Sequence, residues 1–155
     1  MTYWKMPPIA KVYEALTAVA DDRVRMIDDG RAEVVSSSGS KTYAVQWQPE
    51  FSTVSSNDNA SFWQGYLGYP IIAVLMKAGK LTYDPKAAEA LRGIEWKRIN
   101  DEHKRDYEGA VAEVLRGVEA SGADPKSVVT EVERIYGALE QERLGKGRSS
   151  EKPPK

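Results

Sequence analysis

The sequence predicts an α+β protein with an N-terminal helix, a small antiparallel sheet of two or three strands, and a helical part that ends in an antiparallel helix pair. Three patterns lead to this prediction. Apolar residues recur every three or four positions over residues 9–20, and again along residues 85–139. Between them, two segments with strand character flank a Ser/Gly turn. We expect a single globular domain over residues 1–144, with residues 31–78 as its central β-β-α-like module.

The N-terminal helix is predicted from its apolar face. Pro7 and Pro8 stiffen the approach to this helix and suit its first turn. Its apolar face consists of Ile9, Val12, Tyr13, Leu16, Val19 and Ala20. Asp28-Asp29-Gly30 is a turn signal. The helix should therefore end near residue 20, and the chain should turn near residue 30.

The strands are predicted from alternation. Residues 31–36 and 41–48 have strand character, and Ser37-Ser38-Gly39-Ser40 forms the turn between them. In the second segment Tyr43, Val45 and Trp47 share one face. Because proline cannot donate to a strand ladder, Pro49 ends this strand or places it at a sheet edge. A third short strand is expected over residues 51–54.

The helical part is predicted from start signals and periodicity. Asp84-Pro85 and Asp124-Pro125 each combine a side chain that accepts free amide hydrogens with a proline that suits the first helical position. A short helix is also expected over residues 71–78. One long helix is expected from Trp96 to Glu119, because its apolar residues step by three or four. Its short connection to the last helix predicts antiparallel packing of the two.

Composition limits the classes of function. The net charge of −1 and pI of about 5.9 are far from those of a protein that coats nucleic acid, so nucleic-acid binding would need a local patch. The absence of cysteine excludes disulfides and thiolate chemistry. The N-terminus lacks the apolar core of a signal peptide, and the longest apolar run, residues 71–76, is far shorter than the roughly 20 residues of a membrane span. We expect a cytoplasmic protein with no membrane contact.

No catalytic residue is predicted. His103 is the only histidine, so a tetrahedral zinc site would need mostly carboxylate ligands. No serine lies in a nucleophile motif, and the glycine patterns of phosphate and dinucleotide loops are absent. The sequence therefore favours a non-catalytic protein without metal or cofactor, and an enzyme is the alternative.

An aromatic cluster is the candidate binding surface. Its members are Trp47, Phe62, Trp63, Tyr66 and Tyr69. One interpretation is a stacking platform for single-stranded bases or for a partner peptide. The other is a small core that holds the loop against the sheet. Since residues 46–76 contain no Lys or Arg, they lack the positive charge that a phosphate groove needs. The sequence therefore favours the core first and a protein-binding surface second.

The central module resembles a known zinc-binding domain. Residues 35–45, VSSSGSKTYAV, and residues 71–75, IIAVL, are similar to the first strands and the closing helix of the SWIM domain. The resemblance places the family's Cys-x-Cys pair near Ser55-Ser56-Asn57 and its Cys-x-His pair on Gly68-Tyr69-Pro70. Gly and Pro offer no side-chain ligand. The resemblance thus implies a degenerate, metal-free relative of that domain.

Two hypotheses for function follow. SWIM domains have DNA- and protein-binding roles, and the charge favours protein, so the first hypothesis is a non-catalytic interaction module that binds a protein partner or self-associates. The alternative is a small-molecule-binding protein or an enzyme, with a pocket at the junction of sheet and helices lined by Trp47, Trp63, Tyr66 and Tyr69. Residues 145–155 contain no apolar side chain and are expected to form a disordered basic tail.

Overall fold

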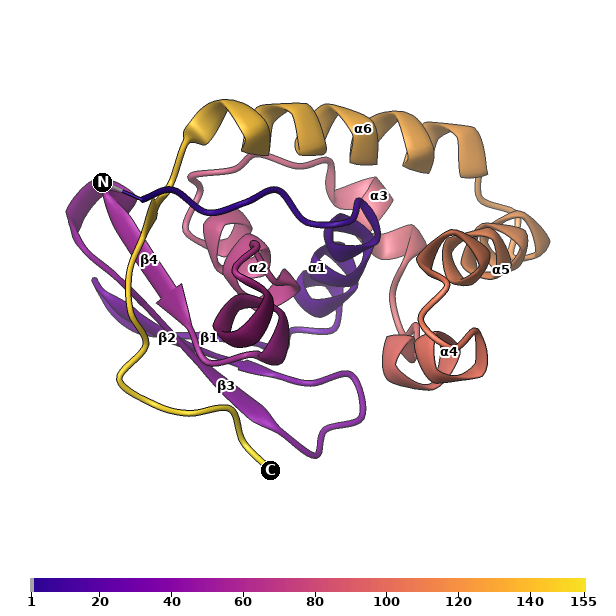
Figure 1. The fold of residues 1–155 in the computed structure, drawn as a ribbon. Helices are drawn as coiled ribbons and strands as arrows, with labels where there is room; N and C mark the ends of the chain where they lie inside the picture. The colour runs from indigo at the N-terminus through magenta and orange to yellow at the C-terminus, as the bar shows by residue number, and fades with distance from the viewer. Residues whose placement is uncertain (1) are drawn as a thin grey trace.

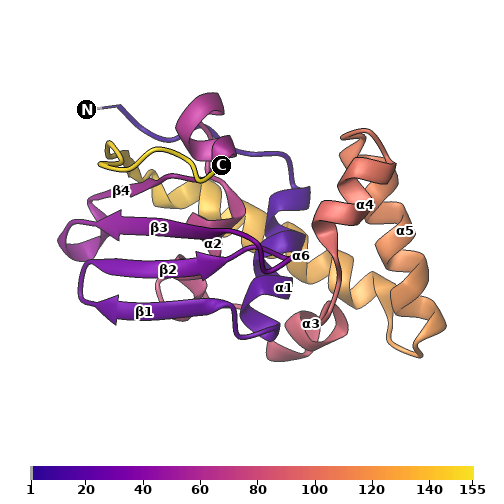
Figure 2. The same cartoon turned by 90° about the horizontal axis from the view of Figure 1, so that it is seen from below.

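Five strands form one mixed sheet, in the order β1-β2-β3-β4-β5. They are β1 (Val24–Asp28), β2 (Arg31–Val35), β3 (Thr42–Trp47), β4 (Thr53–Ser56) and β5 (Gly145–Lys146). The computed structural model describes residues 2–155, and Figure 2 shows β1 to β4 side by side with helices behind them. The predicted α+β class is confirmed. The predicted count of two or three strands is wrong.

The two additional strands lie at the edges of the sheet. β1 pairs with β2, but the adjacent apolar residues Met26 and Ile27 break its alternation, so its sequence gives no clear strand signal. In the structure only Val24 of this strand is buried. β5 has only two residues and pairs with β4 in parallel, with Thr53 opposite Gly145. The first residues of the segment expected to be disordered therefore belong to the sheet. Further along, the backbone carbonyl of Lys152 accepts a hydrogen bond of 3.2 Å from Asn57 Nδ2.

The helices follow the predicted start signals. They are α1 (Ala10–Ala20), α2 (Tyr69–Lys77), α3 (Pro85–Ala90), α4 (Trp96–Glu102), α5 (Tyr107–Ala120) and α6 (Pro125–Glu142), with short helical turns η1 (Pro49–Phe51) and η2 (Ala60–Gln64). The carboxylates of Asp84 and Asp124 accept hydrogen bonds of 2.9 and 3.0 Å from the amides of Lys86 and Lys126. Both Asp-Pro starts are confirmed. Within residues 2–155 no helix has the length and apolar character needed to cross a membrane.

Helices α1 and α2 form the centre of the molecule. Figure 1 shows them between the sheet and the outer helices, with α6 running across the far side. Residues 70–76 of α2 and 10–18 of α1 are buried without interruption, because each helix has neighbours on more than one side. The largest core side chain, Trp96, donates a hydrogen bond of 2.9 Å from Nε1 to Thr17 Oγ1. This bond fixes the start of α4 against α1.

The long helix predicted from Trp96 to Glu119 is wrong, because the chain turns between α4 and α5. Lys104 and Arg105 have left-handed backbone conformations, with φ of 52° and 67°. Asp106 then starts the new helix, and its carboxylate accepts a hydrogen bond of 3.3 Å from the amide of Gly109. The predicted antiparallel pair also differs from the structure, since α6 runs across Figure 1 while α5 is seen nearly end-on.

Relief of the backbone strain at this turn should raise stability. A left-handed conformation costs a non-glycine residue about 1–2 kcal/mol. Part of this gain is lost to the greater freedom of glycine in the unfolded chain, so Lys104→Gly should raise the free energy of unfolding by about 0.5–1 kcal/mol. Urea unfolding measures the change. Arg116→Gly, in the regular interior of α5, is the control and should lower stability by about 1 kcal/mol. If both Lys104→Gly and Arg116→Gly lower the free energy of unfolding, the assignment of strain to this turn is contradicted.

Candidate functional site

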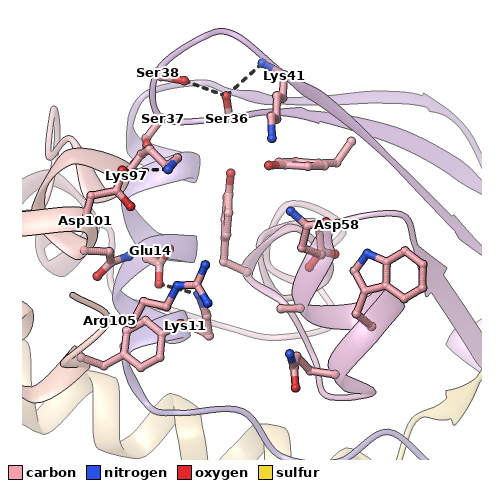
Figure 3. Close-up of a pocket in the computed structure, with 18 of the residues that line it drawn as sticks. Lys11, Glu14, Ser36, Ser37, Ser38, Lys41, Asp58, Lys97, Asp101 and Arg105 are labelled. Carbon is pink, nitrogen blue, oxygen red and sulfur yellow. Dashed lines mark hydrogen bonds and ion pairs between the residues drawn. The ribbon is translucent and has the colours of Figure 1, made fainter. Parts of the chain in front are cut away.

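A cavity of about 490 Å³ lies where the β2–β3 turn, α1, and the α4–α5 region meet. Figure 3 shows its lining, which combines charged, hydroxyl and aromatic side chains. Its charged lining residues are Lys11, Glu14, Lys41, Asp58, Lys97, Asp101 and Arg105. This volume is within the range of about 300–1,000 Å³ that is typical of small-molecule sites.

Lys11 and Glu14 of α1 form a buried ion pair at this cavity. Lys11 Nζ lies 3.1 Å from Glu14 Oε2, and the two side chains are only 11% and 7% exposed. Burial raises the pKa of Glu14, and the ammonium of Lys11 opposes that shift. Burial lowers the pKa of Lys11, but the Glu14 carboxylate, together with the nearby phenols of Tyr107 and Tyr66, raises it by more, so the net shift is upward. They are the only charged residues of α1.

Tyrosine side chains surround this ion pair. The Tyr43 and Tyr69 rings meet edge to face, with centroids 6.4 Å apart. Lys11 Nζ lies 4.9 Å from the centroid of the Tyr107 ring, which is the geometry of a cation–π contact. Burial raises the pKa of Tyr43, Tyr66 and Tyr69 above the usual value of 10.0. These three phenols therefore remain uncharged at neutral pH.

Three further cations approach the cavity from the β2–β3 turn and from α4 and the turn that follows it. Lys97 pairs with Asp101, with Nζ to Oδ2 at 2.8 Å. Within residues 2–155, neither Lys41 nor Arg105 has a carboxylate oxygen within 4.0 Å. Figure 3 shows Arg105 extending from its strained turn toward Lys11 and Glu14. Lys41 and Arg105 are therefore the two cations of the lining that can pair with an anionic ligand.

Hydrogen bonds fix the β2–β3 turn beside these cations. Ser36 Oγ accepts a bond of 3.1 Å from the amide of Lys41. Ser37 Oγ accepts a bond of 3.2 Å from the amide of Lys97, the second residue of α4. Two segments that are distant in sequence are thereby joined, so Lys41 and Lys97 keep their places relative to each other.

Asp58 is buried on the side of the cavity opposite Lys97 and Arg105. Its carboxylate accepts hydrogen bonds from Ser56 Oγ and, at 3.0 Å, from the amide of Ser61. Ser61 Oγ in turn accepts a bond of 3.0 Å from the amide of Gly68. A Cβ added at Gly68 would lie 2.1 Å from Asp58 Oδ2, so this position has no room for a side chain.

This network joins the two segments on which the SWIM resemblance places ligand pairs. Ser56 belongs to the first and Gly68 to the second, and hydrogen bonds through Asp58 and Ser61 connect them. Among residues 2–155 no group of three or more His, Cys, Asp or Glu side chains is placed to hold a metal ion. His103 lies at the C-terminal boundary of α4, with Nε2 at 2.9 Å from Glu113 Oε1.

The predicted aromatic cluster is divided. Trp63, Tyr66 and Tyr69 line the cavity. Trp47 instead stacks on Phe51, with centroids 4.9 Å apart and an interplanar angle of 15°. Phe62 also lies outside the lining and meets the Trp63 ring at 4.7 Å.

The cations of the cavity could not be found from the aromatic segment, residues 46–76. They come from four separate parts of the chain, none of them within residues 46–76. The local signal for Lys11 and Glu14 was weak: a single charged pair inside an otherwise uncharged helix. Only the tertiary structure brings these side chains to the aromatic residues.

Comparison with known proteins gives a family without a stated activity. The family model described as "Uncharacterised conserved protein UCP014422" matches residues 4–145. No curated protein and no solved structure matches the chain. All the lining residues of the cavity, from Lys11 to Tyr107, are within the matched range.

Proposed function

We propose that this chain, which belongs to the family described as Uncharacterised conserved protein UCP014422, binds a small organic anion in the cavity. The observation that carries the proposal is the pair of cations, Lys41 and Arg105, that have no ion-pair partner within residues 2–155 and line a cavity of about 490 Å³. The proposal develops the alternative hypothesis from the sequence: of the four aromatics expected to line that pocket, Trp63, Tyr66 and Tyr69 line this cavity, and Trp47 does not.

The charge balance of the lining supports an anionic ligand. Four cations and three carboxylates line the cavity. Two of the carboxylates, Glu14 and Asp101, are paired with lysines. The third, Asp58, already accepts hydrogen bonds from Ser56 and Ser61. A phosphate or carboxylate near Arg105 would therefore form charge-assisted hydrogen bonds that the protein itself leaves unmade.

The interaction-module hypothesis remains a second candidate. Trp63 is 68% exposed, and a large exposed aromatic is typical of contact surfaces with other proteins. A degenerate, metal-free SWIM-like module is consistent with the order β2, β3 and α2 along the chain. Elemental analysis of the purified protein tests the metal-free part of this second proposal, because stoichiometric zinc would contradict it.

Calorimetric titration with ribose 5-phosphate tests the anion-binding proposal. The unaltered protein should bind one equivalent at low ionic strength. Arg105→Gln and Lys41→Gln each remove a charge-assisted contact, so each should weaken binding by about tenfold or more. Arg116→Gln is the matched control, since it removes one exposed positive charge from α5 outside the cavity. It should change the affinity by less than about twofold.

Two results would contradict the proposal. The first is the absence of saturable heat with the unaltered protein. The second is an equal loss of affinity in Arg105→Gln and Arg116→Gln, which would indicate attraction by the surface charge as a whole.

A further inference from the structure

We infer that the anion is a mononucleotide, whose base stacks on Trp63 while its phosphate pairs with Arg105. This inference rests on the proposed anion-binding function and adds the chemical class of the ligand. It follows from the placement of an exposed aromatic ring and of unpaired cations in the lining of one cavity.

Trp63 is held in an exposed position. Among the large hydrophobic side chains of residues 2–155 it is the most exposed, at 68%. The ring of Phe62 meets it at 4.7 Å with an interplanar angle of 74°, so an aromatic neighbour supports its orientation. The π-helical turn η2 carries both residues and ends at Gly65, whose φ is 74°. An indole held at the lining of the cavity offers a surface on which a flat base can stack.

The segment that carries Trp63 and the α4–α5 region, which carries Lys97 and Arg105, lie on different sides of the cavity. Trp63 follows Asp58 in the connection between β4 and α2, and Figure 3 draws Asp58 across the cavity from Lys97 and Arg105. A bare phosphate bound at Arg105 would leave the side of the cavity that carries Trp63 unoccupied. A ligand that uses both sides needs a planar ring and an anionic group joined by a short linker, as in a nucleotide.

Polar side chains of the same lining suit such a linker. Ser38 and Gln64 are exposed, and Asn100 is half-buried. Their hydroxyl and amide groups can both donate and accept hydrogen bonds, as ribose hydroxyls do. The cavity volume of about 490 Å³ leaves room for base, sugar and phosphate together.

The fold also removes the main objection to base stacking. The aromatic segment, residues 46–76, contains no Lys or Arg and so by itself cannot hold a phosphate. In the folded chain Lys41 and Arg105 line the same cavity as Trp63. The positive charge comes from the β2–β3 turn and the α4–α5 turn.

Titrations with AMP and with ribose 5-phosphate test this inference. AMP should bind about tenfold more tightly, because only AMP carries the base. Trp63→Leu should reduce the affinity for AMP to that of ribose 5-phosphate for the unaltered protein. Tyr3→Leu, which changes an exposed aromatic outside the cavity, should leave the affinity for AMP unchanged. Circular dichroism and the urea midpoint establish that Trp63→Leu is folded, as expected for so exposed a residue.

The outcomes separate this inference from the function on which it rests. Equal affinities for AMP and ribose 5-phosphate, with both lowered by Arg105→Gln, would overturn the nucleotide inference and leave anion binding intact. Binding of neither compound would overturn both. Binding of a single-stranded oligonucleotide without binding of AMP would overturn the mononucleotide as ligand. An equal loss of affinity for AMP in Trp63→Leu and Tyr3→Leu would show that Trp63 does not stack on the base.

Discussion

Replacement of Lys11 alone with Met is expected to lower the free energy of unfolding by about 3–5 kcal/mol. The substitution leaves the Glu14 carboxylate, whose side chain is 7% exposed, without its partner at 3.1 Å. A buried charge without a partner loses its solvation and gains nothing in return. Urea unfolding at pH 7 measures the effect.

The double variant Lys11→Met with Glu14→Leu shows whether the loss of stability comes from the unpaired charge or from altered packing at these two positions. Replacing a whole buried ion pair with apolar residues of similar size is often neutral or stabilising by about 1–4 kcal/mol. We therefore expect the double variant to regain most of the stability that Lys11→Met loses. A double variant as unstable as the single one would show that the cost comes from packing and not from charge.

The deficit of Lys11→Met should also depend on pH. The folded-state pKa of Glu14 is raised above its ordinary value of 4.5, so the folded protein binds more protons between 4.5 and that higher pKa. Stability therefore falls as pH rises through this window. Without Lys11 the pKa of Glu14 rises further, and the pH range over which stability falls extends upward. The stability difference between Lys11→Met and the unaltered protein should therefore be smallest near pH 4 and grow toward neutral pH. A deficit that is constant with pH would contradict the burial of this carboxylate.

Gly68→Ala is expected to lower the free energy of unfolding by about 2–4 kcal/mol, through overpacking and the loss of buried hydrogen bonds. The new Cβ would lie 2.1 Å from Asp58 Oδ2 and 2.9 Å from Ser61 Oγ. Both atoms belong to the buried network that positions residues 58–61 beside the cavity. Either the carboxylate or the start of α2 must move. Thermal and urea unfolding give the change in stability.

Gly117→Ala is the matched control for this substitution. Gly117 lies inside α5, and a Cβ added there would meet no atom within 4 Å. The same chemical change should therefore raise stability by about 0.5–1 kcal/mol, because alanine is the better helix former. If both variants gain stability, the close approach of Gly68 to Asp58 is contradicted.

The sequence predicted those elements whose signals are local. The two Asp-Pro starts, the first helix and the strands on either side of the Ser/Gly turn depend on neighbouring residues, and all of them form. β5 could not be predicted, because its pairing with Thr53 and Val54 joins residues about ninety positions apart. The break between α4 and α5 was missed because the apolar stripe continues through it, and Asp106 was not recognised as a helix start.

The candidate site was predicted only in its aromatic part. Trp63, Tyr66 and Tyr69 form a visible group in the sequence because they lie within a few residues of one another. Lys41 and Arg105 look like ordinary surface charges there. In the tertiary structure no carboxylate oxygen of residues 2–155 lies within 4.0 Å of either cation, and both line a cavity together with Trp63. Neither property can be read from the sequence.

The amide spectrum of the ¹⁵N-labelled protein, titrated with ribose 5-phosphate, tests the central claim most directly. Binding in the cavity should shift the amide resonances of residues 36–41, 58–66 and 97–107, which are the segments that supply most of its lining. The resonances of residues 125–142, in α6, should remain in place. Shifts confined to α6 or to residues 147–155, or an unchanged spectrum at saturating ligand, would contradict the assignment of the cavity as an anion-binding site.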